Sequence, residues 1–239
     1  MLNNQFSGKC GIVTGASRGI GLEIARKMAE NGINLTLVAR SADALKNNAN
    51  EFKERFGIET LICNKDIRDE KEVIEIVKKT LDHFGSIDYL INNAGYVDPV
   101  GILEMTLENW STVVETNLTG TFLFTRETVR YSMKEMGGKI INIASTAGLT
   151  PRPGWSAYAA SKAGIINFSL TMAEELKEYD IKVYCLSPGR TATQLRKTLA
   201  PEEDQSTILQ PENIADTVMF LLSRDGDFID GQSITIRKR

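Results

Sequence analysis

The sequence predicts an α/β protein in which helices cover both faces of one doubly wound, parallel sheet. Short β-branched runs alternate with longer stretches whose apolar residues recur at helical spacing. The runs are almost continuously apolar, which is typical of strands buried on both faces of a parallel sheet. Strand and helix alternate without a break in composition, so we expect one sheet of about seven strands.

Seven runs are the candidates for these strands. In chain order they cover residues 10–14, 35–39, 60–63, 89–92, 139–144, 182–186 and 233–236. After the first run, Ile20, Ile24 and Met28 fall on one face of a helix, as a helix that packs on a sheet requires.

Length and composition limit the possible classes of protein. The 239 residues allow one large domain or two small ones, and the strand series spans 10–236, so a single domain over 1–239 is expected. Lys plus Arg (28) nearly balances Asp plus Glu (31), which argues against partners recognised by bulk charge, such as nucleic acid or a membrane surface. Neither a signal peptide nor a membrane span is evident, so the predicted location is cytoplasmic.

Histidine is almost absent, since His83 is the only one. A histidine-rich metal site is therefore excluded, and no metal is expected. His83 follows a polar helical stretch, where a cation favours the helix C-terminus. A surface role is favoured over a catalytic one.

The first strand runs directly into a glycine-rich turn at 14–21. Glycines at this turn let backbone N–H groups approach a phosphate at the start of the next helix. A plain strand–helix turn would also use glycine, but the position after the first strand of an α/β series favours a dinucleotide in a Rossmann fold. The residues expected to contact it are Gly15, Ser17, Arg18, Gly19, Ile20 and Gly21.

The end of the second strand predicts which dinucleotide is bound. Ala39 stands where NAD-binding proteins place an acid for the ribose 2′-hydroxyl, and Arg40 follows it. Arg40 and Arg18 suit a 2′-phosphate, so NADP(H) is the expected cofactor, although Arg40 could also be a solvated strand-end residue. Asp66 ends the third strand, where it could hydrogen-bond the adenine amino group, and Ile67, which follows it, is also expected to bind the cofactor.

A serine, a tyrosine and a lysine form the candidate catalytic group. Ser145 follows the fifth strand, and Tyr158 and Lys162 share one face of a later helix through their spacing of four. A free phenol has a pKa near about 10, so a neighbouring cation would help Tyr158 to exchange a proton at neutral pH.

With these motifs in place, the chain resembles the short-chain dehydrogenase/reductase family over essentially its whole length. The matching motifs are the turn 14–21, Asn92-Asn93-Ala94-Gly95, Asn117, Ser145, Tyr158 with Lys162, and Pro188-Gly189 with Thr193. The resemblance implies that Tyr158 protonates a carbonyl oxygen during reduction and that Ser145 hydrogen-bonds it. It also implies that Lys162 binds the nicotinamide ribose and lowers the Tyr158 pKa.

The same resemblance assigns roles to four further residues. Asn117 would hold a water in a proton chain, Asn93 would line the nicotinamide ribose, and Thr191 and Thr193 would reach the carboxamide or phosphates. Structural alternatives remain open: a strand-end turn for Asn93, a helix–helix hydrogen bond for Asn117, and a cap for Ser145.

Within the family, the pattern is most similar to 3-oxoacyl-[acyl-carrier-protein] reductases. The arginines with which those enzymes dock the carrier protein correspond here to Met136 and Tyr179. The stretch 189–211 is taken as an irregular active-site lid or else a solvated connector. Its part between Thr193 and the last helix is several residues shorter than the lid of those reductases. We therefore expect a small free carbonyl or alcohol substrate, with the carrier-protein reductase as the alternative and a non-catalytic regulatory protein as a remote one.

Two helical stretches, around 110–133 and 156–178, carry more apolar and small residues than one packed face requires. Proteins similar to this chain pair these helices across a two-fold axis. A homodimer or homotetramer is expected.

Overall fold

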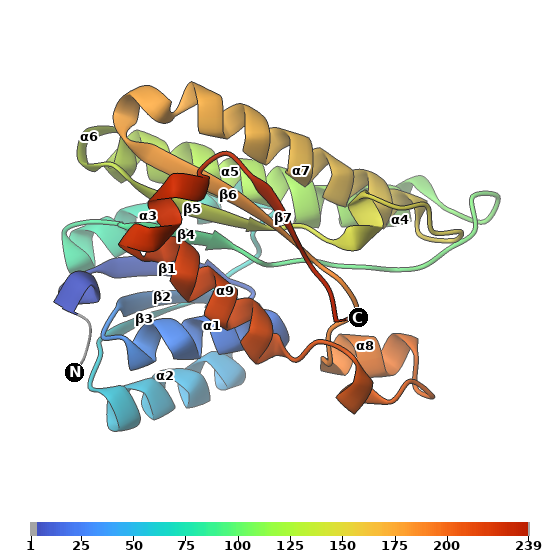
Figure 1. Ribbon diagram of the computed structural model, residues 1–239, viewed down its shortest axis with the longest axis horizontal. Helices are drawn as coiled ribbons and strands as arrows, with labels where there is room; N and C mark the ends of the chain where they lie inside the picture. Colours follow the sequence, from blue (N-terminus) through green and yellow to red (C-terminus); the bar gives the residue numbers. More distant parts are fainter. Residues whose placement is uncertain (1–3, 239) are drawn as a thin grey trace.

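The computed structural model describes residues 4–238, which form a seven-stranded sheet in the order β3-β2-β1-β4-β5-β6-β7 (Figure 1). All neighbouring strands pair in parallel. The strands are β1 (Cys10–Thr14), β2 (Asn34–Ala39), β3 (Thr60–Asn64), β4 (Tyr89–Asn92), β5 (Gly138–Ile143), β6 (Ile181–Pro188) and β7 (Ser233–Ile236). The predicted fold class is confirmed, and each predicted strand is present with its ends shifted by at most two residues.

The helices lie on both faces of the sheet (Figure 1). They are α1 (Gly19–Glu30), α2 (Ala42–Phe56), α3 (Glu70–Phe84), α4 (Leu107–Val114), α5 (Gly120–Thr128), α6 (Lys134–Met136), α7 (Ser156–Glu175), α8 (Gln194–Leu199) and α9 (Pro211–Leu222). Helices α1, α2 and α9 cover one face, and α3, α4, α5 and α7 cover the other. No helix within 4–238 is long and apolar enough to span a membrane.

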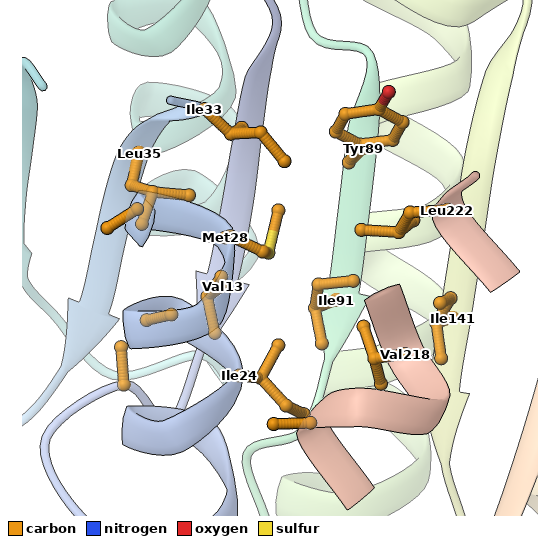
Figure 2. Packing of buried hydrophobic residues seen from close by; sticks show 14 of the residues in the cluster. Val13, Ile24, Met28, Ile33, Leu35, Tyr89, Ile91, Ile141, Val218 and Leu222 are labelled. Atoms are coloured by element: carbon orange, nitrogen blue, oxygen red, sulfur yellow. The ribbon is translucent and has the colours of Figure 1, made fainter. Parts of the chain in front are cut away.

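Two hydrophobic layers fill the space between sheet and helices. On the α1 and α9 side, Ile24 and Met28 pack with Val218 over Val13 and Ile91 of the sheet (Figure 2). The strand residues that alternate with these belong to a second cluster on the opposite face. Both clusters exclude water, which explains the continuous apolarity of the strands.

Helices α4 and α5 are joined through an unusual segment. Residues Glu115–Thr119 have π-helical hydrogen bonding, and Val129–Met133 has it again after α5. Such widened turns inside helices are frequent at functional sites. Asn117 lies in the first of them.

His83 lies in the last turn of α3, where its Nε2 is 3.4 Å from a carboxylate oxygen of Glu59. Its side chain is exposed.

Candidate active site

A cleft of about 830 Å³ runs along the edge of the sheet where the parallel strands end. Every residue predicted to bind the cofactor lines it, as do Ser145, Tyr158 and Lys162. The strand order reverses between β1 and β4, so their following loops diverge and leave a crevice at this edge.

The glycine turn forms a close backbone contact at one end of the cleft. A Cβ on Gly21 would come 2.3 Å from Asn93 Nδ2 and 2.4 Å from the Gly15 carbonyl oxygen. Gly15 itself has a φ of +69°, a conformation that favours glycine. Helix α1 begins without a side-chain cap at Arg18, so its first N–H groups keep no side-chain acceptor. This arrangement fits a phosphate group.

Arg18 and Arg40 line the outer part of the cleft with exposed side chains. Neither forms an ion pair within residues 4–238, so both guanidinium groups retain their donors. Asp66 lines the cleft, and its carboxylate is also paired with Arg68: Nε of Arg68 donates to both carboxylate oxygens and Nη2 donates to one of them, at 2.7 to 3.1 Å. The pairing lowers the pKa of Asp66 and occupies much of its accepting capacity. Ile67 lines the cleft beside it.

Asn93 connects the ends of β1 and β4. Its Nδ2 donates to the Thr14 carbonyl oxygen at 3.0 Å, and its backbone N–H donates to the Thr14 hydroxyl, also at 3.0 Å. The strand-end role that we left open is therefore present. The residue also lines the cleft, as expected for contact with the cofactor.

Lys162 lies at the inner end of the cleft and is only 3% exposed. Its Nζ donates to the Ile143 carbonyl oxygen at 2.8 Å and lies 5.7 Å from the centroid of the Tyr158 ring. Burial disfavours the charged form and lowers the pKa of Lys162 to about 8.

Tyr158 lies in the first turn of α7, one turn before Lys162, and its ring meets that of Trp155 edge to face at 5.7 Å. Burial raises the pKa of the Tyr158 phenol, while hydrogen bonding to Ser145 and the charge of Arg152 act in the opposite direction. The Ser145 hydroxyl also accepts the Ala147 N–H at 3.1 Å, so it is a helix cap as well. Because burial raises its pKa above the ordinary value, the Tyr158 phenol is protonated at neutral pH.

Asn117 is fully buried behind the cleft and does not line it. Its Oδ1 accepts the Tyr96 N–H at 2.7 Å, and its Nδ2 donates to the Tyr96 carbonyl oxygen and to the Ser161 hydroxyl of α7. The helix–helix hydrogen bond is thus present. A Cβ on Gly95 would come 3.3 Å from Asn117 Oδ1 and 3.7 Å from Lys162 Nζ, so a glycine here keeps the space between them open.

The segment 189–211 is more ordered than the sequence predicts. It contains the helix α8, whose first turn is capped by the Thr193 hydroxyl accepting the Arg196 N–H at 3.1 Å. An ion pair between Arg196 and Glu203 then ties the helix to the following turn. The expectation of a wholly irregular stretch is wrong, because local capping and pairing stabilise six helical residues. Thr191 and Thr193 both line the cleft.

Several lining residues were not predicted. Arg152 and Trp155 come from the loop before α7, and Gln194 and Leu195 come from α8. The only indication in the sequence that Arg152 lies near the site was its position between Ser145 and Tyr158. The α8 residues had none, because the helix itself was not predicted.

Comparison with known proteins identifies the family. A model of the short chain dehydrogenase family matches residues 9–204. The chain belongs to the short-chain dehydrogenase family. The resemblance seen in the motifs is therefore confirmed, and the chain is an oxidoreductase of this family.

Curated relatives and solved structures agree with this placement. A 3-oxoacyl-[acyl-carrier-protein] reductase of Synechocystis sp. is 37% identical, over 94% of each chain. One from Chlamydia muridarum is 33% identical, over 98% of each. L-sorbose reductase from Gluconobacter frateurii, complexed with NADPH and L-sorbose, superposes with a TM-score of 0.90 at 29% identity, covering 98% of this chain and 96% of that one. A 7α-hydroxysteroid dehydrogenase complexed with NADH has a TM-score of 0.92 at 30% identity, covering 98% and 94%.

Proposed function

We propose that this protein is an NADP(H)-dependent reductase that converts a carbonyl compound to a secondary alcohol, or catalyses the reverse reaction. The observation that carries the proposal is the convergence of Ser145, Tyr158 and Lys162 on the cleft that the glycine turn also lines. When bound, the reduced nicotinamide supplies the hydride.

The preference for NADP(H) rests on charge. The fold alone does not choose, since solved relatives of nearly equal similarity are complexed with NADPH and with NADH. Arg18 and Arg40 provide two exposed guanidinium groups at the lip of the cleft, and β2 ends in Ala39 rather than in an acid. The nearby Asp66 is paired with Arg68. A dianionic 2′-phosphate gains charge-assisted hydrogen bonds from two such guanidinium groups.

Tyr158 is the proposed proton donor to the substrate oxygen. Its raised pKa keeps the phenol protonated, which is the form required for reduction. Ser145 would donate a second hydrogen bond to the same oxygen and so stabilise the negative charge that develops there. Lys162 would hold the nicotinamide ribose, and its cation would stabilise the phenolate left after proton transfer. Asn117 would support a water between itself and Lys162.

A small free substrate is the proposed class. The helices near the expected docking positions carry basic residues that are already paired, since Arg126 and Arg130 both bind the buried Glu127. Lys134 lies over the ring of Tyr179 at 5.6 Å. An acidic carrier protein would therefore find two of these three cations already paired with carboxylates.

Reduction of a 3-oxoacyl group on a carrier protein is the second candidate, and the curated relatives favour it. The deciding experiment compares NADPH oxidation with acetoacetyl carrier protein and with a panel of small ketones and sugars. We expect higher kcat/KM for a member of the panel. Comparable turnover with the carrier thioester would remove the small-substrate proposal.

We further propose that the chain works as one domain and assembles into a homodimer or homotetramer. One sheet joins strands from both ends of the chain, which supports the first statement. Exposed aromatic side chains on α4 and α5, Trp110 and Phe122, support the second.

A further inference from the structure

A second hollow, of about 260 Å³, opens beside the cleft. It lies between the loop after β5, the end of β6, the lid segment and the tail that follows β7. The residues that line it are Thr146, Thr150, Arg152, Gly189, Arg190, Thr207, Ile208, Arg237 and Lys238.

The hollow is continuous with the reacting end of the cleft. Thr146, Arg152, Gly189 and Arg190 line both spaces. Thr146 directly follows Ser145 in the chain, so the hollow begins next to the proposed oxygen-binding serine. None of the glycine-turn residues lines it, which separates it from the place proposed for the cofactor phosphates.

Its lining is strongly basic. Four of the described lining residues are cations, and none is an acid. Arg152 and Arg237 form no ion pair within residues 4–238. The charge of Arg190 is balanced by Glu203, since Arg190 Nη1 lies 2.7 Å from a carboxylate oxygen of Glu203.

The remaining contacts leave hydrogen-bonding capacity at the hollow. Lys238 Nζ donates to the Ser206 carbonyl oxygen at 2.8 Å, and its charge helps to lower the pKa of Asp204. An ammonium group has three donors, so further donors remain. The hydroxyls of Thr150 and Thr207 each donate to a backbone carbonyl, and each can still accept.

We propose that this hollow binds an anionic group of the substrate, a phosphate or a carboxylate, while the carbonyl lies against Ser145 and Tyr158. Guanidinium groups bind both kinds of anion through paired hydrogen bonds, and the absence of an acid from the described lining favours negative charge. The tail after β7 ends near α8 (Figure 1), and Lys238 joins it to the turn at Gln205–Thr207, whose Thr207 also lines the hollow. This assignment rests on the proposed function and narrows its substrate class to anionic carbonyl compounds.

The first test is independent of catalysis. Inorganic phosphate is titrated calorimetrically into the protein saturated with NADPH, at ionic strength held constant with chloride. Saturation with NADPH fills the pocket of Arg18 and Arg40, so the titration reports on other sites. We expect the double variant Arg237→Gln, Lys238→Gln to bind phosphate at least about tenfold more weakly than the unaltered protein. The control double variant, Lys71→Gln with Lys177→Gln, also removes two positive charges, but from exposed positions on α3 and just after α7 that do not line the hollow. It should bind phosphate as the unaltered protein does.

The second test uses matched substrate pairs: dihydroxyacetone phosphate with dihydroxyacetone, and acetoacetate with its methyl ester. The hollow predicts a lower KM for the charged member of at least one pair, and the pair that responds distinguishes phosphate from carboxylate. The Arg237, Lys238 double variant should raise the KM of that charged member, relative to its neutral partner, at least about tenfold.

Three results would overturn the inference: no phosphate binding to the NADPH complex, equal loss of binding in the lysine control, or equal KM values within both pairs. Absence of all NADPH oxidation together with normal phosphate binding would instead count against the proposed function and leave the anion site supported.

Discussion

The protonation states of Tyr158 and Lys162 follow from where α7 places them. Burial acts on both groups but in opposite directions, because it penalises whichever form is charged. It raises the pKa of the phenol and lowers the pKa of the ammonium to about 8. The pair therefore has a protonated tyrosine beside a lysine that can lose its proton in mildly alkaline solution.

A pH dependence of reduction follows. As the pH rises through about 8, Lys162 becomes neutral and no longer stabilises the phenolate that Tyr158 leaves after proton transfer. We expect kcat/KM for carbonyl reduction to fall in this range, and Lys162→Arg, which keeps its charge, to move the fall to higher pH in whatever activity it retains. A flat profile through this range, or an unmoved fall in Lys162→Arg, would contradict the assignment.

Cofactor selection is also decided by single residues. Arg40→Ala removes one of the two guanidinium groups proposed for the 2′-phosphate, so NADPH should bind about tenfold to a hundredfold more weakly while NADH binding stays the same. Binding is measured by fluorescence titration. Arg55→Ala, which removes an exposed arginine of α2 paired with Glu51, serves as the control. If the preference for NADPH survives Arg40→Ala intact, Arg40 has no part in it.

The positions and contacts of some of these residues could be predicted from the sequence, and those of others could not. Tyr158 and Lys162 could be paired in advance because a helix fixes the relation between positions four apart. The pairing of Asp66 with Arg68 is also local, yet no sequence pattern predicts it, and the contact of Asp66 with adenine stays a prediction. The bonds of Asn93 to Thr14 join residues far apart in the chain, so only the strand order determines them.

At the scale of elements, the β1–α1 turn depends on the absence of a side chain. Gly21→Ala would place a methyl group within 2.4 Å of the Gly15 carbonyl oxygen, so the turn must move. We expect a loss of about 1–3 kcal/mol in the free energy of unfolding, together with weaker cofactor binding. Urea denaturation with and without NADPH measures both.

Gly101→Ala is the matched control for that change. Its new methyl group would meet only the end of the flexible Glu104 side chain, which can turn away. Equal stability of the two alanine variants would show that the turn tolerates a side chain.

Helices and strands could be predicted where their apolar residues follow a regular pattern. Elements that depend on capping were harder to predict. The inner strands of the sheet were found because they are buried on both faces, and the partly buried edge strands β3 and β7 were found from their β-branched runs. Helix α8 was missed because it lines the cleft and has no continuous apolar face. It is stabilised instead by the Thr193 cap and by the Arg196–Glu203 ion pair. The π-helical turn at Glu115–Thr119 has no pattern of its own in the sequence.

At the scale of the whole molecule, apolar residues remain on the surface formed by α4, α5 and α7. The rings of Phe122 and Phe168 meet edge to face at 6.5 Å, and Phe122 is 39% exposed. We expect light scattering to give the mass of a dimer or tetramer, and Phe122→Arg to shift it toward a smaller species, because a charge replaces apolar contact area.

Phe228→Arg provides the comparison, since Phe228 is 91% exposed and lies in another part of the surface, after α9. A monomeric unaltered protein would exclude the proposed assembly.

The central claim is that the cleft reduces a carbonyl group with Tyr158 as the proton donor. Its most direct test is the rate of NADPH oxidation by Tyr158→Phe, with Tyr131→Phe as the control that removes a phenolic hydroxyl outside the cleft. The account predicts a rate lower by about 10² to 10⁴-fold for Tyr158→Phe, with NADPH binding retained, and a normal rate for the control. An unchanged rate in Tyr158→Phe would contradict it.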